Sequence, residues 1–281
     1  MLLIAAPETV SPGRRRGHSA GNDFWITAYM GANRYDPGAA PPPLDGSLYP
    51  MAFLVEQDAG CVAPSHFHQA DQFQVVLAGD GRLGTHDVAP VAVHFAGAWS
   101  PYGPLVAGGA GLHYFTLRNG WDPGARYMQE ERALLRSVPG RRHREVVAAP
   151  RPASVGLIDT VSVCESCLPE SDDGLVARRY VLPAGERAIG ANPASGDGQY
   201  WVVIGGSMLH DRAELAARAC VFLSPDEPAF TAVAGPGGLE VLSLQFPRRT
   251  ARRPAAGRTA ASTAVAGETT AGTTAAGMMA G

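Results

Sequence analysis

Short apolar runs separated by glycine- and proline-containing segments recur along the whole chain. In the first half such runs lie at 24–29, 51–57, 91–95 and 112–117, and they are rich in aromatic and β-branched residues. Each is shorter than a typical helix and is bounded by turn-forming residues, as in the proline-rich loop at 36–49. This pattern is typical of a β-sandwich or β-barrel.

One stretch breaks the strand pattern. Residues 129–137 read QEERALLRS, with acidic residues first and arginine last, which matches the dipole of a helix. Pro139 and Gly140 then end the helical signal. We therefore expect a helix here, followed by a linker through 155.

The second half of the chain repeats the first. With a shift of 127 residues, QFQVVLAG at 72–79 aligns with QYWVVIGG at 199–206, and 106–112 aligns with 233–239 without a gap. Farther upstream, Gly60 matches Gly185 only if the second copy has two extra residues. Repetition of this kind predicts two similar barrels.

Composition excludes several classes of protein. The chain has 281 residues, 17% charged residues and a net charge of −3, and it contains no lysine. Lysine Schiff-base chemistry and a P-loop are thereby excluded, and we expect no nucleic-acid or membrane partner. No segment has the length of a membrane span or the order of a signal peptide, so we expect a cytoplasmic protein. Cys164 and Cys167 form a single CxxC, which we interpret as incidental.

The histidine pair His66 and His68 is the main candidate for chemistry. Alternate side chains of a strand point to the same face, so both imidazoles would converge on one point. Gln72 follows four residues after His68. Two imidazoles and an amide oxygen are ligands suited to a first-row transition metal.

The spacing around this pair resembles the first motif of the cupin superfamily. That motif is Gly, five residues, His-x-His, three or four residues, Glu, six residues, Gly. The chain matches it from Gly60 through His66 and His68 to Gly79, with Gln72 in place of Glu. The resemblance implies an all-β fold of two jelly-roll cupin barrels in one chain, a bicupin, with one short helix between them. It also implies one divalent metal (Fe, Mn, Ni or Zn) bound by His66, His68 and Gln72.

We expect five regions. They are a flexible N-terminus at 1–20, an N-terminal barrel with the metal site at 21–125, a helix and linker at 126–155, a degenerate C-terminal barrel at 156–247 and a disordered tail at 248–281. The C-terminal barrel is expected to hold no metal, because Pro193 and Ser195 replace the two histidines.

The second cupin motif is only weakly matched. Many cupins have Pro-His-Gly-Pro where this chain has Pro101-Tyr102-Gly103-Pro104, so Tyr102 takes the position of a metal-binding histidine. Tyr102 is our candidate catalytic residue: it could ligate a ferric ion, donate a hydrogen bond to substrate or act as an acid, and packing is the alternative. Weaker substrate-binding candidates are Gln74, Phe95, Trp99 and His113. The strand histidines His94 and His113 could also complete the metal coordination, and His113 is the better reserve ligand.

Two functions follow from the resemblance. The first is a metal-dependent enzyme acting on a small oxygenated organic molecule, most simply a dioxygenase or related oxidoreductase. The alternative is a non-catalytic, sensor-like bicupin that binds a small molecule, because glutamine at position 72 is frequent in cupin sensor domains, where no metal is needed. A storage-type bicupin without an active site is a third interpretation. We leave a homodimer open.

Overall fold

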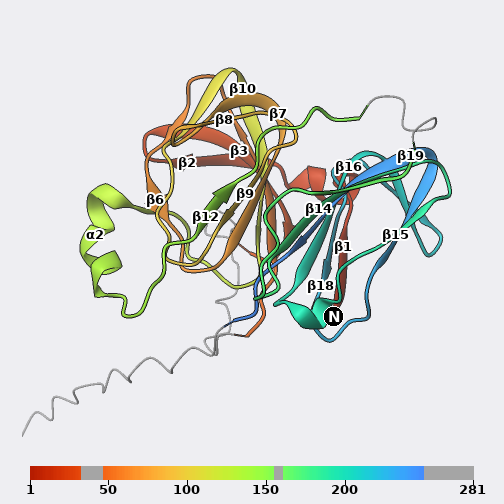
Figure 1. Ribbon diagram of the computed structural model, residues 1–281. Helices are drawn as coiled ribbons and strands as arrows, with labels where there is room; N and C mark the ends of the chain where they lie inside the picture. The colour runs from red at the N-terminus through yellow and green to blue at the C-terminus, as the bar shows by residue number, and fades with distance from the viewer. Residues whose placement is uncertain (33–46, 155–160, 250–281) are drawn as a thin grey trace, which may run out of the picture. The chain divides into compact units, whose positions relative to one another are not determined.

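The computed structural model describes residues 1–32, 47–154 and 161–249. The predicted disordered tail at 248–281 lies almost entirely outside the described residues, as do parts of the predicted loop and linker. Within Met1–Arg249 the chain is built mainly from antiparallel strands, which form two separate sheets that close into two barrels (Figure 1).

The first barrel is formed by a nine-stranded sheet. Its main path runs β12-β9-β7-β10-β4-β3-β2, with β5 paired to β10 and β8 paired to β7. The strands are β2 (Arg15–Ser19), β3 (Asn22–Met30), β4 (Met51–Gln57), β5 (Val62–Ala63), β7 (Gln72–Leu83), β8 (His86–Val88), β9 (Val93–Ala96), β10 (Leu105–Arg118) and β12 (Glu145–Val147). A separate pair, β6 (His66–Phe67) and β11 (Arg126–Tyr127), completes it.

The second barrel is formed by an eight-stranded sheet. Its main path runs β1-β18-β16-β19-β14-β13, with β15 paired to β19 and β17 paired to β16. The strands are β1 (Leu2–Ala5), β13 (Val163–Ser166), β14 (Val176–Leu182), β15 (Arg187–Ile189), β16 (Gln199–His210), β17 (Ala213–Ala216), β18 (Cys220–Leu223) and β19 (Thr231–Gln245). The helical elements of the described chain are α1 (Pro7–Val10), η1 (Ser11–Gly13), α2 (Met128–Ser137) and η3 (Pro193–Ser195).

The predicted two-barrel fold and the predicted helix between the barrels are confirmed. Strands β7 and β16 begin at Gln72 and Gln199, which are separated by the predicted offset of 127 residues. Strands β9 and β18 keep this offset, whereas β4 and β14 differ by two fewer residues, as the match of Gly60 to Gly185 requires. The repeat in the sequence is therefore a repeat of strand positions.

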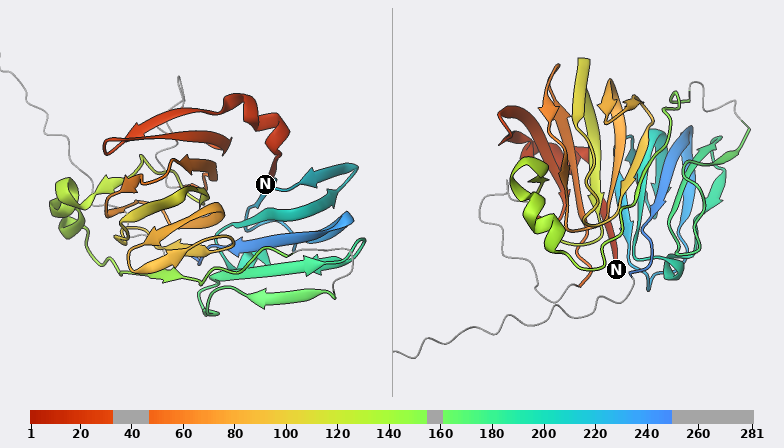
Figure 2. Two further views of the ribbon diagram at one scale, coloured as in Figure 1. Left: turned by 90° about the horizontal axis from the view of Figure 1, so that it is seen from above. Right: turned by 60° about the vertical axis from the view of Figure 1, so that its left-hand side comes forward.

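The two sheets pack face to face (Figure 2). Side chains alternate along each strand, so one face of β4 carries Ala52 and Leu54 into the core shared with the second sheet. The opposite face points Phe53 and Val55 into the interior of the first barrel. The Tyr200 hydroxyl of the second barrel lies within hydrogen-bond distance of the backbone oxygens of Met51 (3.1 Å) and Arg118 (2.9 Å) in the first and shares its one hydrogen between them. The second barrel thus supports the strand ends of the first.

The N-terminal segment differs from our expectation. We expected residues 1–20 to be flexible, but Leu2–Ala5 pairs with Cys220–Leu223 of the second barrel, and Arg15–Ser19 pairs with β3 of the first. The apolar side chain of Ala5 enters the shared core. Four apolar residues at the start of the chain are enough to extend a sheet edge, which no local signal reveals.

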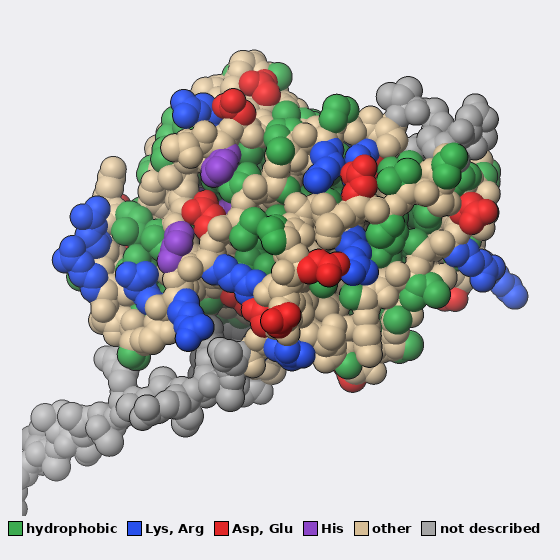
Figure 3. Space-filling view, viewed as in Figure 1, with side chains coloured by type: hydrophobic (Ala, Val, Ile, Leu, Met, Phe, Trp, Pro, Cys, Tyr) green, Lys and Arg blue, Asp and Glu red, His purple; other side chains and the backbone are tan. Residues whose placement is uncertain are grey.

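The surface of the described chain carries charges of both signs. On the face shown in Figure 3, acidic and basic side chains are interspersed with hydrophobic ones. None of the helices among the described residues is long and apolar enough to cross a bilayer.

Candidate functional site

Backbone pairing brings the predicted site residues together inside the first barrel. His66 lies on β6, His68 follows it directly, and Gln72 begins β7. Tyr102 forms an isolated β-bridge with His66 through two backbone hydrogen bonds. The backbone nitrogen of His66 donates to the backbone oxygen of Tyr102 at 3.0 Å, and the backbone nitrogen of Tyr102 donates to the backbone oxygen of His66 at 2.9 Å. All four side chains are buried, so the structure gathers these four predicted site residues at one place.

These side chains form a continuous chain of hydrogen bonds. His66 Nδ1 lies 2.7 Å from the Pro64 carbonyl oxygen and donates to it, which leaves Nε2 as an acceptor for the Tyr102 hydroxyl at 2.9 Å. The amide nitrogen of Gln72 donates to the same hydroxyl at 2.6 Å. The Gln72 amide oxygen accepts in turn from Nε and Nη2 of Arg118, at 2.9 and 2.6 Å.

Arg118 is the main residue that sequence reasoning missed. It ends β10, where it pairs directly with Gln72 across the strands, and only 3% of it is exposed. The apolar run predicts a strand that ends at Leu117, and a single arginine after such a run is typical of a residue that returns to solvent. Its place opposite Gln72 follows only from the strand register. One signal was available: the offset of 127 residues pairs Arg118 with Gln245, a polar position in both copies.

Asp122 is a second residue that was missed. Its Oδ1 accepts from His68 Nδ1 at 2.8 Å and lies 3.4 Å from Nη1 of Arg118. The backbone nitrogens of Gln69 and Gly124 also donate to its carboxylate, at 2.7 and 2.8 Å. Burial alone would raise the pKa of Asp122, but His68, Arg118 and these hydrogen bonds hold it below the ordinary value. Asp122 is therefore a buried carboxylate that fixes the His68 ring and neutralises Arg118.

Two titratable groups of the site, His66 and Tyr102, are uncharged at physiological pH. Burial is the largest cause that lowers the pKa of His66 to about 3, and neighbouring His68 adds to the effect. Burial likewise raises the pKa of the Tyr102 hydroxyl above its ordinary value. An uncharged Tyr102 can donate or accept a hydrogen bond. Because its surroundings raise the pKa of the hydroxyl, they do not make Tyr102 a stronger acid.

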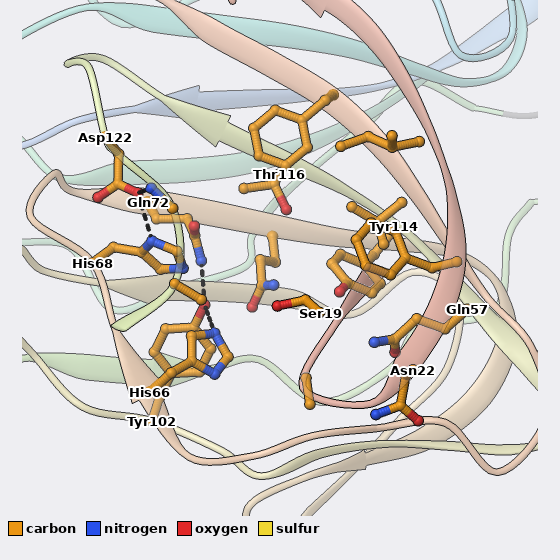
Figure 4. Close-up of a pocket in the computed structure, with 18 of the residues that line it drawn as sticks. Ser19, Asn22, Gln57, His66, His68, Gln72, Tyr102, Tyr114, Thr116 and Asp122 are labelled. Carbon is orange, nitrogen blue, oxygen red and sulfur yellow. Dashed lines mark hydrogen bonds and ion pairs between the residues drawn. The ribbon is translucent and has the colours of Figure 1, made fainter. Parts of the chain in front are cut away.

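A cavity of about 100 Å³ lies beside these side chains (Figure 4). Its lining is polar at one end, with the hydrogen-bonded set just described, which we call the polar wall: His66, His68, Gln72, Tyr102, Arg118 and Asp122. The middle of the lining is apolar, with Phe24, Ile26, Phe53 and Val55. The half-buried Ser19 and Tyr127, whose hydroxyl oxygens lie 2.5 Å apart, also line the cavity.

The weaker candidates divide between the cavity and other places. Gln74 lines the cavity, and its amide oxygen accepts from Nδ1 of buried His94 at 2.8 Å. Phe95 packs in the core between the sheets instead, on the opposite face of its strand. Trp99 lies beyond the lining, with its ring centroid 5.8 Å from that of Phe67. His113 points away from the cavity toward Glu56, 3.8 Å from its carboxylate.

The donor set fits a divalent metal poorly. One feature favours a metal, because Nδ1 of each histidine is held by an oxygen and Nε2 carries the lone pair, as in many metal sites. However, Nη2 of Arg118 lies 3.2 Å from Nε2 of His68, and the Gln72 oxygen is already shared by two N–H groups of Arg118. A second cation beside this guanidinium would be repelled by several kcal/mol even at an effective dielectric constant of about 20.

The remaining ligands do not offset that repulsion. No three side chains of His, Cys, Asp or Glu gather into a metal-binding group in the described ranges 1–32, 47–154 and 161–249. Asp122 lies on the Nδ1 side of His68, whereas a metal would be bound through Nε2. The glutamate of the family motif would supply a negative charge, whereas Gln72 supplies none. The residues present therefore do not fit the metal that the motif implies.

Comparisons with known proteins support the fold. No family model matches the sequence, and no curated protein matches it. Among solved structures, YhhW of Escherichia coli aligns over 89% of this chain and 99% of its own, with 12% identity and a TM-score of 0.54. A candidate dioxygenase from Nostoc punctiforme aligns over 88% and 83%, with 13% identity and a TM-score of 0.57. An oxalate decarboxylase from Bacillus subtilis aligns over 88% and 78%, with 8% identity and a TM-score of 0.51.

The chain has the bicupin fold. At these identities the likeness concerns the fold alone. YhhW, described as a bacterial pirin, has been solved in complex with nickel(II), which is a property of that protein.

The second barrel of this bicupin has no equivalent of the polar wall. Pro193 and Ser195, at the positions of the two histidines, belong to the 3₁₀ turn η3. Gln199, at the position of Gln72, accepts from the Trp201 indole nitrogen at 2.6 Å. The Trp201 ring stacks on Tyr180 with 5.6 Å between centroids, and it is fully buried in the core of the second barrel.

Proposed function

We propose that this bicupin binds a small, uncharged organic molecule in the cavity of its first barrel, without a resident metal ion. The observation that carries the proposal is the position of Arg118. Its guanidinium bonds Gln72 and lies beside His68, so a fixed cation already occupies the neighbourhood that a metal would need. The side chains of the polar wall are held in place by hydrogen bonds to one another.

The charge balance of the wall favours a neutral ligand. The buried charges are Arg118 and Asp122, which oppose each other, while His66 and Tyr102 are uncharged. A charged ligand would enter a buried site with no counter-charge left over, and burying an unpaired ion is costly. The apolar middle of the cavity favours a small hydrocarbon ring or chain.

The cavity size sets the scale of the ligand. Its volume of about 100 Å³ is enough for several heavy atoms. Engineered cavities of about 150 Å³ take up benzene. The cavity is smaller than that, so we expect a molecule no larger than one small ring, such as a cyclic ketone, with its oxygen toward the N–H groups of the polar wall.

Cyclohexanone is a suitable first probe, because the chain has no lysine side chain that could form a Schiff base with it. Titration calorimetry should show binding to the wild-type protein, unchanged by prior treatment with a chelator. Gln74→Trp, which copies Trp201 of the second barrel, should fill the cavity and abolish binding, while Gln74→Met is the control that keeps the cavity open. Equal binding to the Trp variant would show that the ligand sits elsewhere.

Metal content separates this proposal from the metal-dependent enzyme that the sequence motif suggested. After dialysis against Zn²⁺, Ni²⁺ or Mn²⁺, we expect the wild-type protein to retain far less than one ion per chain. The double variant with Gln72→Glu and Arg118→Met removes the cation and restores the carboxylate, and it should retain about one ion. The opposite result would be one bound ion per wild-type chain and none in the double variant with His66→Ala and His68→Ala. That result would favour the metal-dependent dioxygenase or oxidoreductase instead.

A further inference from the structure

The end of the cavity away from the polar wall contains a buried acceptor atom. Gln57 is the last residue of β4 and lines the cavity on the same strand face as Phe53 and Val55. Only 6% of Gln57 is exposed, and its amide oxygen is buried without a hydrogen-bond partner. Figure 4 shows Gln57 at the end of the cavity opposite to His68.

Such an atom is unusual in a folded protein. More than about 90% of buried polar groups have a partner, because leaving one unpaired destabilises the folded state. Its neighbour Asn22 is already engaged: the amide nitrogen donates to the backbone oxygens of Ala20 and Val62, at 2.9 and 2.8 Å. The Gln57 oxygen is therefore ready to accept from a donor that enters the cavity.

The polar wall has the opposite character. The Gln72 amide nitrogen carries two hydrogens, and its hydrogen bond to the Tyr102 hydroxyl uses one of them. Arg118, which also lines the cavity, has only N–H donors and no acceptor. The wall thus offers donors, and the far end offers an acceptor, with the apolar side chains between them.

The second barrel shows that this polar residue goes with the cavity. Strands β4 and β14 match with an offset of 125 residues, which pairs Gln57 with Leu182. Leu182 packs in the apolar core of the second barrel. A polar side chain therefore stands at this strand position beside the cavity of the first barrel, and an apolar, packed side chain stands at the equivalent position of the second.

We propose that the ligand is bifunctional: a small neutral molecule with a carbonyl-type acceptor at the polar wall and a hydroxyl or N–H donor that bonds the Gln57 amide oxygen. This inference rests on the proposed function, because it specifies the ligand of the same cavity. It makes Gln57 the residue that selects hydroxylated ketones or related molecules over their unsubstituted parents.

A matched series of probes tests the inference. Cyclohexanone has the acceptor alone, cyclohexanol has one hydroxyl, and 4-hydroxycyclohexanone has both groups. In the wild-type protein, calorimetry should show 4-hydroxycyclohexanone binding about fivefold to tenfold more tightly than cyclohexanone, the effect of one buried hydrogen bond. Gln57→Leu, which has the Leu182 side chain, should abolish that preference, and cyclohexanone should then bind at least as tightly as the hydroxyketone.

The control is Gln57→Glu, which keeps an acceptor oxygen and should keep the preference. The inference is overturned if the wild-type protein binds the two ketones equally, or if Gln57→Leu retains the preference. In either case the proposed function would still hold if the wild-type protein binds cyclohexanone and the Gln74→Trp variant does not. If none of the three probes binds the wild-type protein, both the inference and the proposed function are overturned.

Discussion

The two barrels have matching strand positions, yet at equivalent positions of the described chain the first holds a cavity and the second a packed aromatic cluster. The clearest cause is one pair of equivalent residues, Gln74 and Trp201, separated by the repeat offset. Gln74 turns aside to bond His94, and space remains beside it. Trp201 is fully buried between Tyr180 and Phe230 and fills the same region of its barrel. A duplicated framework can thus hold a binding site in one copy and a packed core in the other.

A second difference concerns charge. Gln72 pairs with Arg118 in the first barrel, and Gln199 pairs with Gln245 at the same register in the second. The second pair forms a neutral amide hydrogen bond of 3.1 Å. The first introduces a buried cation, which requires Asp122 as its counter-charge. The exchange of glutamine for arginine at this register therefore accounts for the buried ion pair of the polar wall.

The largest expected effect comes from giving the second barrel the residue of the first. Trp201→Gln removes a fully buried aromatic side chain and should lower the free energy of unfolding by about 3–5 kcal/mol. Chemical denaturation measures the loss. The reciprocal change, Gln74→Trp, fills existing space and should cost less than about 2 kcal/mol. Equal losses would show that packing at this position does not distinguish the barrels.

A somewhat smaller loss in the free energy of unfolding is expected from Arg118→Gln, which introduces the residue that the second barrel has at the equivalent position, Gln245. It leaves the buried Asp122 carboxylate without its cation and should cost about 3 kcal/mol. Adding Asp122→Asn should recover most of that stability, because the neutral pair needs no counter-charge. If the single and double variants are equally unstable in denaturation experiments, the charge balance described for the wall is incorrect.

His66 should make the stability of the wild-type protein depend on pH, and the variant His66→Gln should remove this contribution. The second barrel has Pro193, which does not titrate, at the equivalent position. The folded-state pKa of about 3 lies below the ordinary value of 6.5, so the unfolded chain takes up the proton first as pH falls. The stabilisation is complete above pH 6.5 and decreases toward pH 3, by about 2 kcal/mol at pH 5. His66→Gln should lose correspondingly less stability between pH 7 and pH 5. Identical pH profiles would contradict the lowered pKa.

The smallest expected effect belongs to Tyr102, which aligns with Ala229. Tyr102→Phe keeps the ring but removes the hydroxyl that joins His66 and Gln72, at a cost of about 1–2 kcal/mol. Cyclohexanone affinity should change by less than about threefold, because the wall donors Gln72 and Arg118 remain. Loss of binding in this variant would assign the hydroxyl a direct contact with the ligand.

Much of the architecture could be predicted from the sequence, because short-range patterns carry it. The apolar runs placed the strands, and the 127-residue offset placed the second barrel on the first. The motif glycines also had a physical reason: Gly79 has φ of +78°, and a Cβ there would lie 2.0 Å from the backbone oxygen of Gly111. The motif also selected His66, His68, Gln72 and Tyr102, which the structure brings together.

The chemistry of the site was decided by tertiary structure. Arg118 and Asp122 lie far from the histidine motif along the chain, and only the pairing of β7 with β10 places the guanidinium against Gln72. Phe95 and His113 were both candidates for the lining of the cavity, but neither side chain lines it. Which face of a strand points into the barrel depends on the tertiary packing around that strand. The sequence by itself determined two barrels and one histidine pair, because strand periodicity and motif spacing are local. Whether that pair faces a metal or an arginine depends on long-range strand register, which local patterns do not encode.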